Sequence, residues 1–524
     1  APAEYSTGNS LTGAPGDATR WPAWFAALTE EHRAACLVTA DDHRIWIAAE
    51  RLLEWRSVHP DARLYPAIDA APGTARDWDA DDALAALLRD RLAGLGPVSR
   101  EQLARALAVD KERIDTALLR LQGQGYAVRM EQEGVAELWC ERRLLARIHR
   151  YSRERRRQAV KPVPPEAYLR FLARWHALDE PASLERALER LEGWAAPVHC
   201  WVHSLLPARV AAPDSVALDL QFLSGRLNWF RPPLARGEAR RVVPGSPVAL
   251  VPRGHLDDWL RAESLPEVSE ASDEERSDAV ERVVALLRAG GATFQDDLVR
   301  ATGMSEPEVQ EALRSLVYDG AVTADAFSPL LALLRPKSGK GRRRRRGSLP
   351  VGRWSLLEAP AEYDECAGPQ ARRSERLATI SLALLKRYGV VFRAVLQREP
   401  LLPPWRDLLH ALRRLEDRGE ALGGRFVDGF SGEQFALPEA ASLLRQCQRP
   451  ADNPSTAVIS GVDPLNLGGI LVPGPKTPAL AAHRILLEDG LPRARLIGDA
   501  LDLLPAGHSG SAGLAEELLR RPLR

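Results

Sequence analysis

The 524-residue sequence is poor in the groups that metal and nucleotide sites require. Its five cysteines are scattered without a CxxC pair, which argues against a zinc ribbon or an iron–sulfur cluster. No GxxxxGK[ST] stretch occurs: Gly339-Lys340 is followed by another glycine, and a proline separates Gly474 from Lys476. Without that loop the chain lacks the backbone cradle for a nucleotide β-phosphate. We therefore expect no metal, no cofactor and no ATP-driven motor in this chain.

Long apolar runs and an excess of one charge are also missing. No apolar stretch reaches membrane-spanning length and no signal peptide is recognisable, so we expect a cytoplasmic chain with no membrane partner. Because 71 basic residues balance 71 acidic ones, any nucleic-acid surface has to come from local patterning. Only six of the basic residues are lysines. The arginine bias is typical of a GC-rich genome, but arginine also binds phosphates and guanine edges in a bidentate manner.

The most informative feature that is present is an internal repeat, ALxxLxxxG, which begins at Ala117, Ala312 and Ala411. Its leucines fall on one helical face, and its glycine suits a left-handed helix cap. Each copy follows a short helix with a capping or proline signal and precedes a strand-like run. This order is that of a winged helix-turn-helix, so three copies predict a tandem array, with generic helical bundles as the alternative.

Further segments complete the predicted organisation. Residues 33–50 hold two apolar runs around Ala40–Asp42 and predict a hairpin. A looser winged-helix-like unit follows, in which residues 216–230 predict a hairpin turning at Ser224-Gly225. Near the C-terminus, Asp489-Gly490 predicts another hairpin. We predict an α+β fold, a tandem array of winged-helix domains with a β-rich, barrel-like module. The expected domains are an N-terminal β-containing module (1–80), a winged helix (81–165), a winged-helix-like unit (166–262), a winged helix (278–336), a basic linker (337–374), a winged helix (375–450) and a C-terminal β-rich module (451–524).

The helix expected at 405–418 is the best candidate for a recognition helix. Its leucines form a buried stripe with Trp405, and its cations lie on the opposite flank, although a solvated arginine face is the alternative. The copy around Ala312 offers only Gln310 and Arg314, so we expect that unit to be mainly structural. The predicted DNA-binding residues are Arg406, His410, Arg413, Arg414, Arg425, Gln434, Lys111, Arg113, Arg120, Arg342, Arg343 and Arg344.

The stretch GGRFVDGFSGEQFALPEA (423–440) has two interpretations. Its glycines are compatible with an active loop, but its register after Gly419 predicts the wing of the last winged helix. Phe426 and Phe435 would then anchor the hairpin to the leucine stripe.

Tryptophan side chains are a second candidate for DNA contacts, because tryptophans such as Trp21, Trp24 and Trp46 are able to stack on unpaired bases. Core packing is the default interpretation for each of them.

Several stretches resemble one known family. RYGVVFRAVLQREPLLPPWRDLLHALRRLEDRGEALGGRFVDGFSGEQFALPEA (387–440) closely resembles the C-terminal region of the bacterial large helicase-related proteins (Lhr). DPLNLGGILVPGPKTPALAAHRILLEDGLP (463–492), GRWSLL (352–357) and LLPARV (205–210) resemble the same region, and the matches run through nearly the whole chain.

The resemblance implies a DNA-repair protein with a 3′-to-5′ helicase core that is absent here, in accord with the absent phosphate loop. It also implies tandem winged helices and a β-barrel module, similar to glycosylases that unhook interstrand crosslinks; uracil excision is ascribed to some members. The implied partners are single-stranded or duplex DNA in the nucleoid, the helicase core of the same polypeptide, and a second copy in a homo-oligomer.

Catalysis stays open in the sequence. The related glycosylases use a Gln-x-Gln or Gln-x-Asp pair, and Gln446-Cys447-Gln448 and Gln122-Gly123-Gln124 have this spelling but not the matching context. Similarly, His199 and His203 have metal-ligand spacing but lack the other residues of a zincin. We expect a DNA-binding accessory region that supports repair of DNA damage, including crosslinks. A DNA glycosylase acting on uracil, alkylated or crosslinked bases is the alternative, and a transcription-factor-like array is the second.

Overall fold

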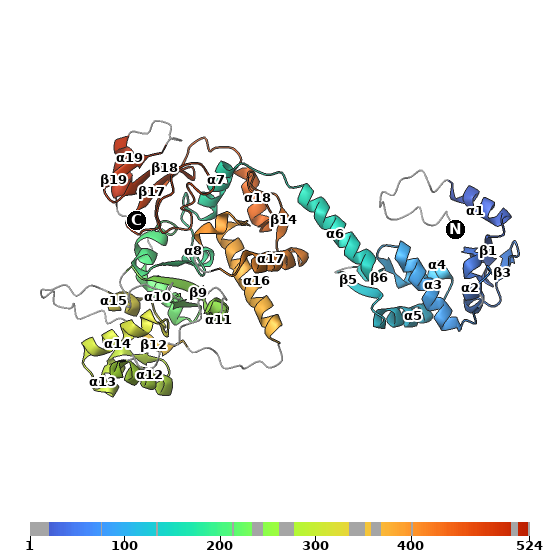
Figure 1. Ribbon diagram of the computed structural model, residues 1–524, viewed down its shortest axis with the longest axis horizontal. Coiled ribbons are helices and arrows are strands. Elements are labelled where there is room, and N and C mark those ends of the chain that lie inside the picture. The colour runs from blue at the N-terminus through green and yellow to red at the C-terminus, as the bar shows by residue number, and fades with distance from the viewer. Residues whose placement is uncertain are drawn as a thin grey trace. The chain divides into compact units, whose positions relative to one another are not determined.

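The computed structural model divides the chain into two compact units, Ala1–Arg155 and Arg156–Arg524, which are described separately (Figure 1). The residues that the structure describes are 20–74, 76–132, 135–211, 214–232, 245–260, 277–334, 352–357, 368–399, 402–504 and 512–521. Within these ranges no helix has the length and apolarity needed to cross a bilayer.

The first unit begins with a small α/β module. A three-stranded antiparallel sheet has the order β2-β1-β3. The predicted hairpin is confirmed, because β1 pairs with β2 across a turn in which Asp42 has a φ of 59°. Ala35, Leu37 and Ile47 face the core of the unit. The elements are α1 (Trp21–Glu30), β1 (Ala34–Val38), β2 (Arg44–Ala48), η1 (Ala49–Arg51), α2 (Leu52–Val58) and β3 (Arg63–Tyr65).

A winged helix completes this unit, and a long basic helix contains its last residue, Arg155. The predicted capping box is present: Gln102 N donates to Ser99 Oγ at 3.3 Å, and Ser99 N donates to Gln102 Oε1 at 2.9 Å. The strands form a sheet of order β4-β6-β5. The elements are α3 (Ala80–Gly94), β4 (Val98–Ser99), α4 (Arg100–Leu107), α5 (Lys111–Gly123), β5 (Ala127–Gln132), β6 (Val135–Glu141) and α6 (Arg142–Gln158).

The second unit contains three more winged helices. The first of them has a sheet of order β7-β9-β8. Its residues 215–223 are helical and not the first arm of a hairpin, so that prediction is wrong. Gly225, with a φ of 73°, follows the helix and does not turn a hairpin. The elements are α7 (Pro165–Trp175), α8 (Leu184–Arg190), β7 (Ala195–Pro197), α9 (Val198–Cys200), η2 (Trp201–Leu205), α10 (Ser215–Leu223), β8 (Leu227–Phe230), β9 (Pro247–Pro252), η3 (Arg253–His255) and α11 (Leu256–Leu260).

The next winged helix has a sheet of order β10-β12-β11. Its central strand, β12, lies in the segment predicted as a basic linker, and Trp354 on that strand is fully buried. The linker prediction is therefore wrong for these four residues, because they pair with strands on both sides. The elements are α12 (Asp278–Gly290), β10 (Thr293–Phe294), α13 (Gln295–Thr302), α14 (Glu306–Tyr318), β11 (Val322–Ala324), α15 (Ser328–Leu333) and β12 (Arg353–Leu356).

The last winged helix has a sheet of order β13-β15-β14. The short helix that the repeat predicts before its third copy is absent, and residues 390–398 form a short strand and a 3-10 helix there. The helix α16 packs against α17, α8 and α11, and so lies at the centre of the second unit. The elements are α16 (Pro369–Tyr388), β13 (Val390–Val391), η5 (Val395–Arg398), α17 (Trp405–Asp417), β14 (Leu422–Gly424), β15 (Gln434–Ala436) and α18 (Pro438–Gln446).

In all four winged helices the helix that precedes the wing ends in the same way. Gly125, Gly225, Gly320 and Gly419 follow α5, α10, α14 and α17, and each has a φ between 67° and 80°. Glycine reaches this left-handed region without the steric cost of a Cβ atom. The repeated glycine therefore ends the recognition helix and starts the hairpin, as the repeat predicts for three copies.

The C-terminal module is an antiparallel sheet of order β16-β17-β18-β19 with α19 packed on it. The predicted turn is confirmed, because Asp489 and Gly490 both have positive φ between β17 and β18. The expected barrel is not found in the described part of the chain, where β16 and β19 are the open edges of the sheet. The elements are β16 (Thr456–Ser460), β17 (Arg484–Glu488), β18 (Leu491–Ile497), β19 (Ala500–Leu503) and α19 (Ala512–Arg520).

Candidate nucleic-acid interface

The helix α17 separates apolar and basic side chains cleanly. Pro404 precedes its first residue, and Leu408, Ala411, Leu412 and Leu415 are buried beneath it. The predicted stripe is thus confirmed. On the opposite face Arg406, His410 and Arg414 are exposed at i, i+4 and i+8. This spacing places the three side chains along one edge of the helix.

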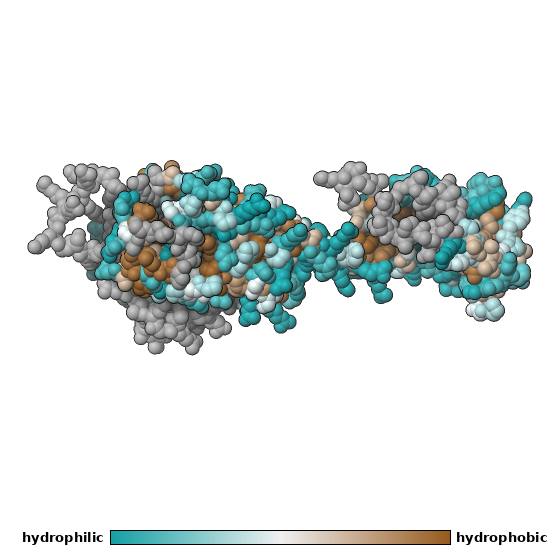
Figure 2. All heavy atoms as spheres, turned by 90° about the horizontal axis from the view of Figure 1, so that it is seen from above, coloured by the Kyte–Doolittle hydropathy of each residue, from teal (hydrophilic) through white to brown (hydrophobic). Residues whose placement is uncertain are grey.

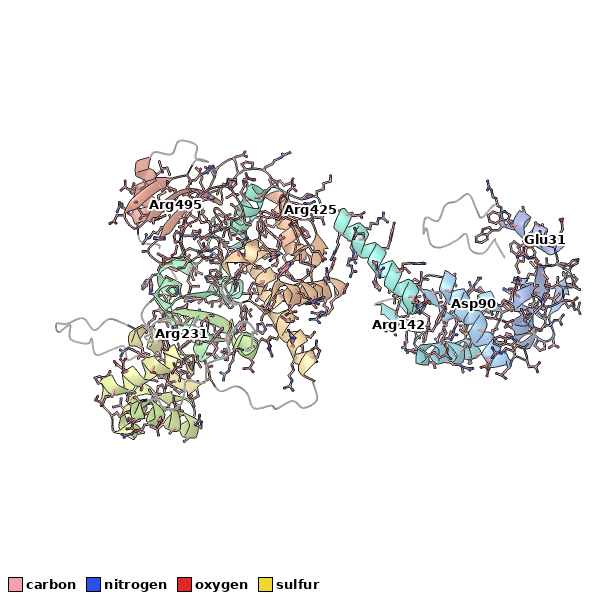
Figure 3. The ribbon with its side chains drawn as sticks, in the orientation of Figure 1. Glu31, Asp90, Arg142, Arg231, Arg425 and Arg495 are labelled. Atoms are coloured by element: carbon pink, nitrogen blue, oxygen red, sulfur yellow. The ribbon has the colours of Figure 1, made fainter. Side chains whose placement is uncertain are left out.

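These three side chains make no hydrogen bond or ion pair with a described residue. Most arginines around them are paired: Arg418 contacts Glu420, and Arg373 contacts Asp407 at 3.3 Å. Because no carboxylate competes for their donors, Arg406 and Arg414 are available to an external anion. Arg425, on the wing, is likewise exposed and without a described partner (Figure 3).

Arg413 has a different environment. It donates through Nε to Glu433 Oε2 at 3.1 Å and makes a second, bidentate contact with the same carboxylate. Arg157 bridges this carboxylate to a second one: its Nη2 lies 3.1 Å from Glu433 Oε2 and 2.5 Å from Glu416 Oε2. The hydrogen bonds from Arg413 hold the pKa of Glu433 below its ordinary value, and the charge of Arg157 adds to the effect.

This brace, formed by Arg157, Arg413, Glu416 and Glu433, ties the wing to α17. Strand β14 passes so close that a Cβ atom on Gly423 would lie 2.3 Å from Glu416 Oε1. Glycine at this position therefore serves close packing and not a phosphate loop. The predicted anchors are confirmed, since Phe426 and Phe435 are buried in the same core cluster as the leucines of α17.

The prediction that Gln434 contacts DNA is wrong, because its side chain is fully buried. Its Oε1 accepts hydrogen bonds from the backbone N–H groups of Phe426 and Val427 at 2.9 and 2.8 Å. Its Nε2 donates to the carbonyl of Val427 at 2.7 Å. These bonds satisfy backbone groups that the ladder leaves unpaired, so Gln434 shapes the wing from inside.

The other predicted contacts lie in several environments. On α5, Lys111 is exposed without a described partner, whereas Arg120 lies 2.5 Å from Asp82 and Arg113 lies 3.8 Å from Asp81. Arg342, Arg343 and Arg344 lie outside the described residues. On α14, Arg314 donates to the carbonyl of Leu333 at 3.0 Å and pairs with Glu311. This pairing agrees with a structural role for that unit.

One basic element was missed from the sequence. The helix α6 contains eight arginines, one histidine and a single acidic residue, Glu154. Glu141 caps its start by accepting from the N–H groups of Arg143 and Leu144 at 2.9 and 2.5 Å. Arg143, Arg147 and Arg150 are exposed along it, and Figure 2 shows this stretch as predominantly hydrophilic. The signal was available in RRLLARIHRYSRERRRQ as a run of one charge.

A cavity of about 660 Å³ adjoins the start of α17. It is lined by η5, the first turn of α17 and the wing turn, with Trp405 and Phe430 as its aromatic residues. Its carboxylate, Glu399, is occupied structurally, because it pairs with buried Arg387 and accepts from Tyr388 Oη at 2.8 Å.

The glutamine pairs lie at helix ends, and the histidine pair lies in α9 and η2. Gln446 and Gln448 are exposed where α18 ends, and Gln122 and Gln124 are exposed where α5 ends. Over the part of the chain that the structure describes, no group of three His, Cys, Asp or Glu side chains is arranged to hold a metal ion.

Comparison with known proteins supports the winged-helix description. Two family models, both described as the winged-helix domain of the large helicase-related protein, match residues 163–253 and 370–456. These segments are Lhr winged-helix domains. They coincide with the two winged helices whose sheets are β7-β9-β8 and β13-β15-β14.

Two curated relatives extend the similarity, and the chain is homologous to the C-terminal part of Lhr. The Lhr helicase/uracil glycosylase of Escherichia coli is 28% identical over 434 residues, which cover 73% of this chain and 26% of that protein. The Lhr helicase/probable uracil glycosylase of Mycolicibacterium smegmatis is 27% identical over 453 residues, covering 77% and 28%. The chain thus spans about a quarter of the length of these Lhr proteins. Among solved structures, the DNA glycosylase AlkZ of Streptomyces sahachiroi aligns with a TM-score of 0.39 and 15% identity over 69% of this chain and 99% of its own.

Proposed function

We propose that this chain is the DNA-binding C-terminal region of an Lhr-type DNA-repair helicase. It holds DNA in the nucleoid beside a motor that precedes it in the same polypeptide. The observation that carries the proposal is the row of Arg406, His410 and Arg414, exposed on a recognition-type helix without competing carboxylates.

The geometry supports a division of labour within the last winged helix. Arg406 and Arg414 contact phosphates or base edges, and Arg425 contacts the backbone from the wing. The brace around Glu433 keeps the wing at a fixed angle to α17. The unit containing α14 offers no comparable row, because its arginine is paired within the protein.

The test is a double substitution, Arg406→Ala with Arg414→Ala. Each phosphate contact contributes about 0.9 to the slope of log affinity against log salt on duplex DNA, so we expect the slope to fall by roughly 1.8 and the affinity to drop. Mobility-shift titrations at several salt concentrations measure both quantities.

The matched control is Arg282→Ala with Arg300→Ala, which removes two exposed arginines from the unit containing α14. The two double variants lose the same charge. A specific role for α17 therefore requires Arg406→Ala with Arg414→Ala to weaken DNA binding more than the control does. Equal affinity for the α17 double variant and the unsubstituted chain would exclude this helix as the DNA contact.

A DNA glycosylase is the second candidate function, favoured by the names of both relatives, Lhr helicase/uracil glycosylase and Lhr helicase/probable uracil glycosylase. Incubating the purified chain with uracil-containing or crosslinked duplexes, without ATP, separates the two. Alkali-labile abasic sites that disappear on substitution of a single carboxylate indicate the enzyme. DNA binding without such sites indicates an accessory region.

A further inference from the structure

The outer face of the N-terminal sheet carries an unusual set of side chains. In β1, Ala35 and Leu37 point into the core, so Cys36 and Val38 lie on the other face. Strand alternation places Arg44 and Trp46 of β2, and Arg63 and Tyr65 of β3, on that same face.

Strand pairing arranges these residues in two rows across the sheet. Cys36 pairs with Trp46 on one side and Tyr65 on the other, which forms an aromatic row. Val38 pairs with Arg44 and Arg63, which forms a basic row. The rows are two residues apart along each strand, or roughly 6.6 Å.

The aromatic row is open to solvent. Tyr65 is 58% exposed and Trp46 is 37% exposed. One side of Trp46 is covered by Phe25 of α1, with ring centroids 4.2 Å apart and an interplanar angle of 7°. Helix α1, which ends beside the labelled Glu31 in Figure 3, contributes Trp21 and Trp24, also half exposed. Large exposed aromatic side chains gathered on one face mark a binding surface.

The basic row is free of internal partners. Arg44 and Arg63 make no ion pair with any described residue, whereas Arg33, Arg51, Arg100, Arg113, Arg120 and Arg129 in the same unit all do. A cavity of about 700 Å³ lies over this face and is lined by Cys36, Arg44, Arg63 and Tyr65. Asp42 and Asp61 also line this cavity.

We propose that this face, defined by Arg44, Trp46, Arg63 and Tyr65, binds single-stranded DNA. Unpaired bases stack on Tyr65 and Trp46, and the adjoining phosphates contact Arg44 and Arg63. Stacked aromatics beside a cationic groove are the combination by which proteins hold single strands without sequence preference. Duplex DNA does not satisfy this face, because its bases are already stacked.

The first experiment compares Tyr65→Ala and Tyr65→Phe in the full chain, using a fluorescent 20-mer of thymidine and a duplex of equal length. We expect Tyr65→Ala to weaken binding of the oligothymidine at least about fivefold and Tyr65→Phe to preserve it, since the ring is what stacks. Duplex affinity should be unchanged. Arg406→Ala with Arg414→Ala, by contrast, should weaken duplex binding, so failure of either site is distinguishable from failure of the other.

The second experiment uses the thiol between the two aromatic residues. Of the described cysteines, Cys36 is partly exposed while Cys140, Cys200 and Cys447 are buried, and Cys366→Ser removes the cysteine outside the described residues. Oligothymidine should slow maleimide labelling of Cys36, and equal amounts of duplex should not.

The third experiment tests the two arginines of the face with the double variant Arg44→Gln and Arg63→Gln. Its matched control is the double variant Arg282→Gln and Arg300→Gln. We expect only the first pair to weaken oligothymidine binding beyond the control. The proposal is overturned if Tyr65→Ala binds oligothymidine with unchanged affinity and oligothymidine does not slow maleimide labelling of Cys36. Dissociation of an oligomer by Tyr65→Ala, measured by sedimentation, would overturn it as well, because the face would then be an interface between copies of this chain.

Discussion

At the scale of single residues, exposure and pairing decide which polar groups are available to a ligand. Arg406 and Arg413 are seven residues apart on one helix flank, yet the first is free and the second is held by Glu433. The sequence predicts that flank correctly, because a helix of 3.6 residues per turn separates leucines from arginines. It does not predict which arginine finds a carboxylate, because Glu433 arrives from the wing, 20 residues later.

Gln434 provides the residue-scale prediction. Replacing it with leucine leaves the buried N–H groups of Phe426 and Val427 without their acceptor. Each buried unpaired donor costs about 1–3 kcal/mol, so we expect Gln434→Leu to lower the free energy of unfolding by roughly 3 kcal/mol. Urea denaturation measures this loss. A variant as stable as the unsubstituted chain would show that these hydrogen bonds do not stabilise the wing.

At the scale of elements, the winged-helix repeat was the strongest signal in the sequence. Three copies were recognised because ALxxLxxxG specifies both a buried face and a left-handed stop. For the copy containing α10 the sequence predicts a hairpin, because Ala217, Leu218 and Gly225 match the repeat but Gln221 stands where the second leucine is expected, and the helix shows little polar contrast. Strand β12 was assigned to a linker because sequence periodicity is uninformative over four residues. Its pairing partners β10 and β11 lie far away in the chain.

The brace between the wing and α17 is tested at the scale of elements by the substitution Glu433→Gln. Glu433 has a pKa lowered from 4.5 by Arg413 and Arg157, so its ionised form is favoured in the folded state. Its contribution is therefore complete above pH 4.5 and is lost as the pH falls through the lowered pKa. We expect the variant to be about 1 kcal/mol less stable at neutral pH.

The pH dependence distinguishes this explanation from a general packing defect. Denaturation of the unsubstituted chain and of Glu433→Gln, above and below pH 4.5, should show that the stability difference between them shrinks in acid. A difference that stays constant across this range would show that the charge of Glu433 has no part in holding the wing.

At the scale of the second unit, two stretches that carry the family resemblance meet in its interior. Arg209, from LLPARV, and Asp463, from DPLNLGGIL, form a bidentate pair with both N–O distances at 2.8 Å. Each side chain is only 1% exposed. Arg209 also donates through Nε to His176 Nδ1 at 3.0 Å, and burial keeps the pKa of that histidine well below 6.5. The C-terminal sheet is thus joined to the winged helix of residues 163–253 by a buried polar network. Sequence spacing does not reveal this contact, which joins residues 254 positions apart.

Asp463→Asn tests whether this network determines how the C-terminal module is held. Removing one partner leaves the Arg209 charge buried without compensation, which costs about 3–5 kcal/mol. We expect a large fall in thermal stability and earlier proteolysis between residues 447 and 456, where the module connects to α18. The matched control is Asp502→Asn, which breaks the pair of Arg495 and Asp502 in the same sheet; because Asp502 is about half exposed, this change should cost about 1 kcal/mol or less. Equal effects of the two substitutions would mean that the buried pair does not hold the module in place. DNA binding by α17 should survive Asp463→Asn below its unfolding temperature, because the row of Arg406, His410 and Arg414 lies within a winged helix whose sheet, β13-β15-β14, is separate from the C-terminal sheet.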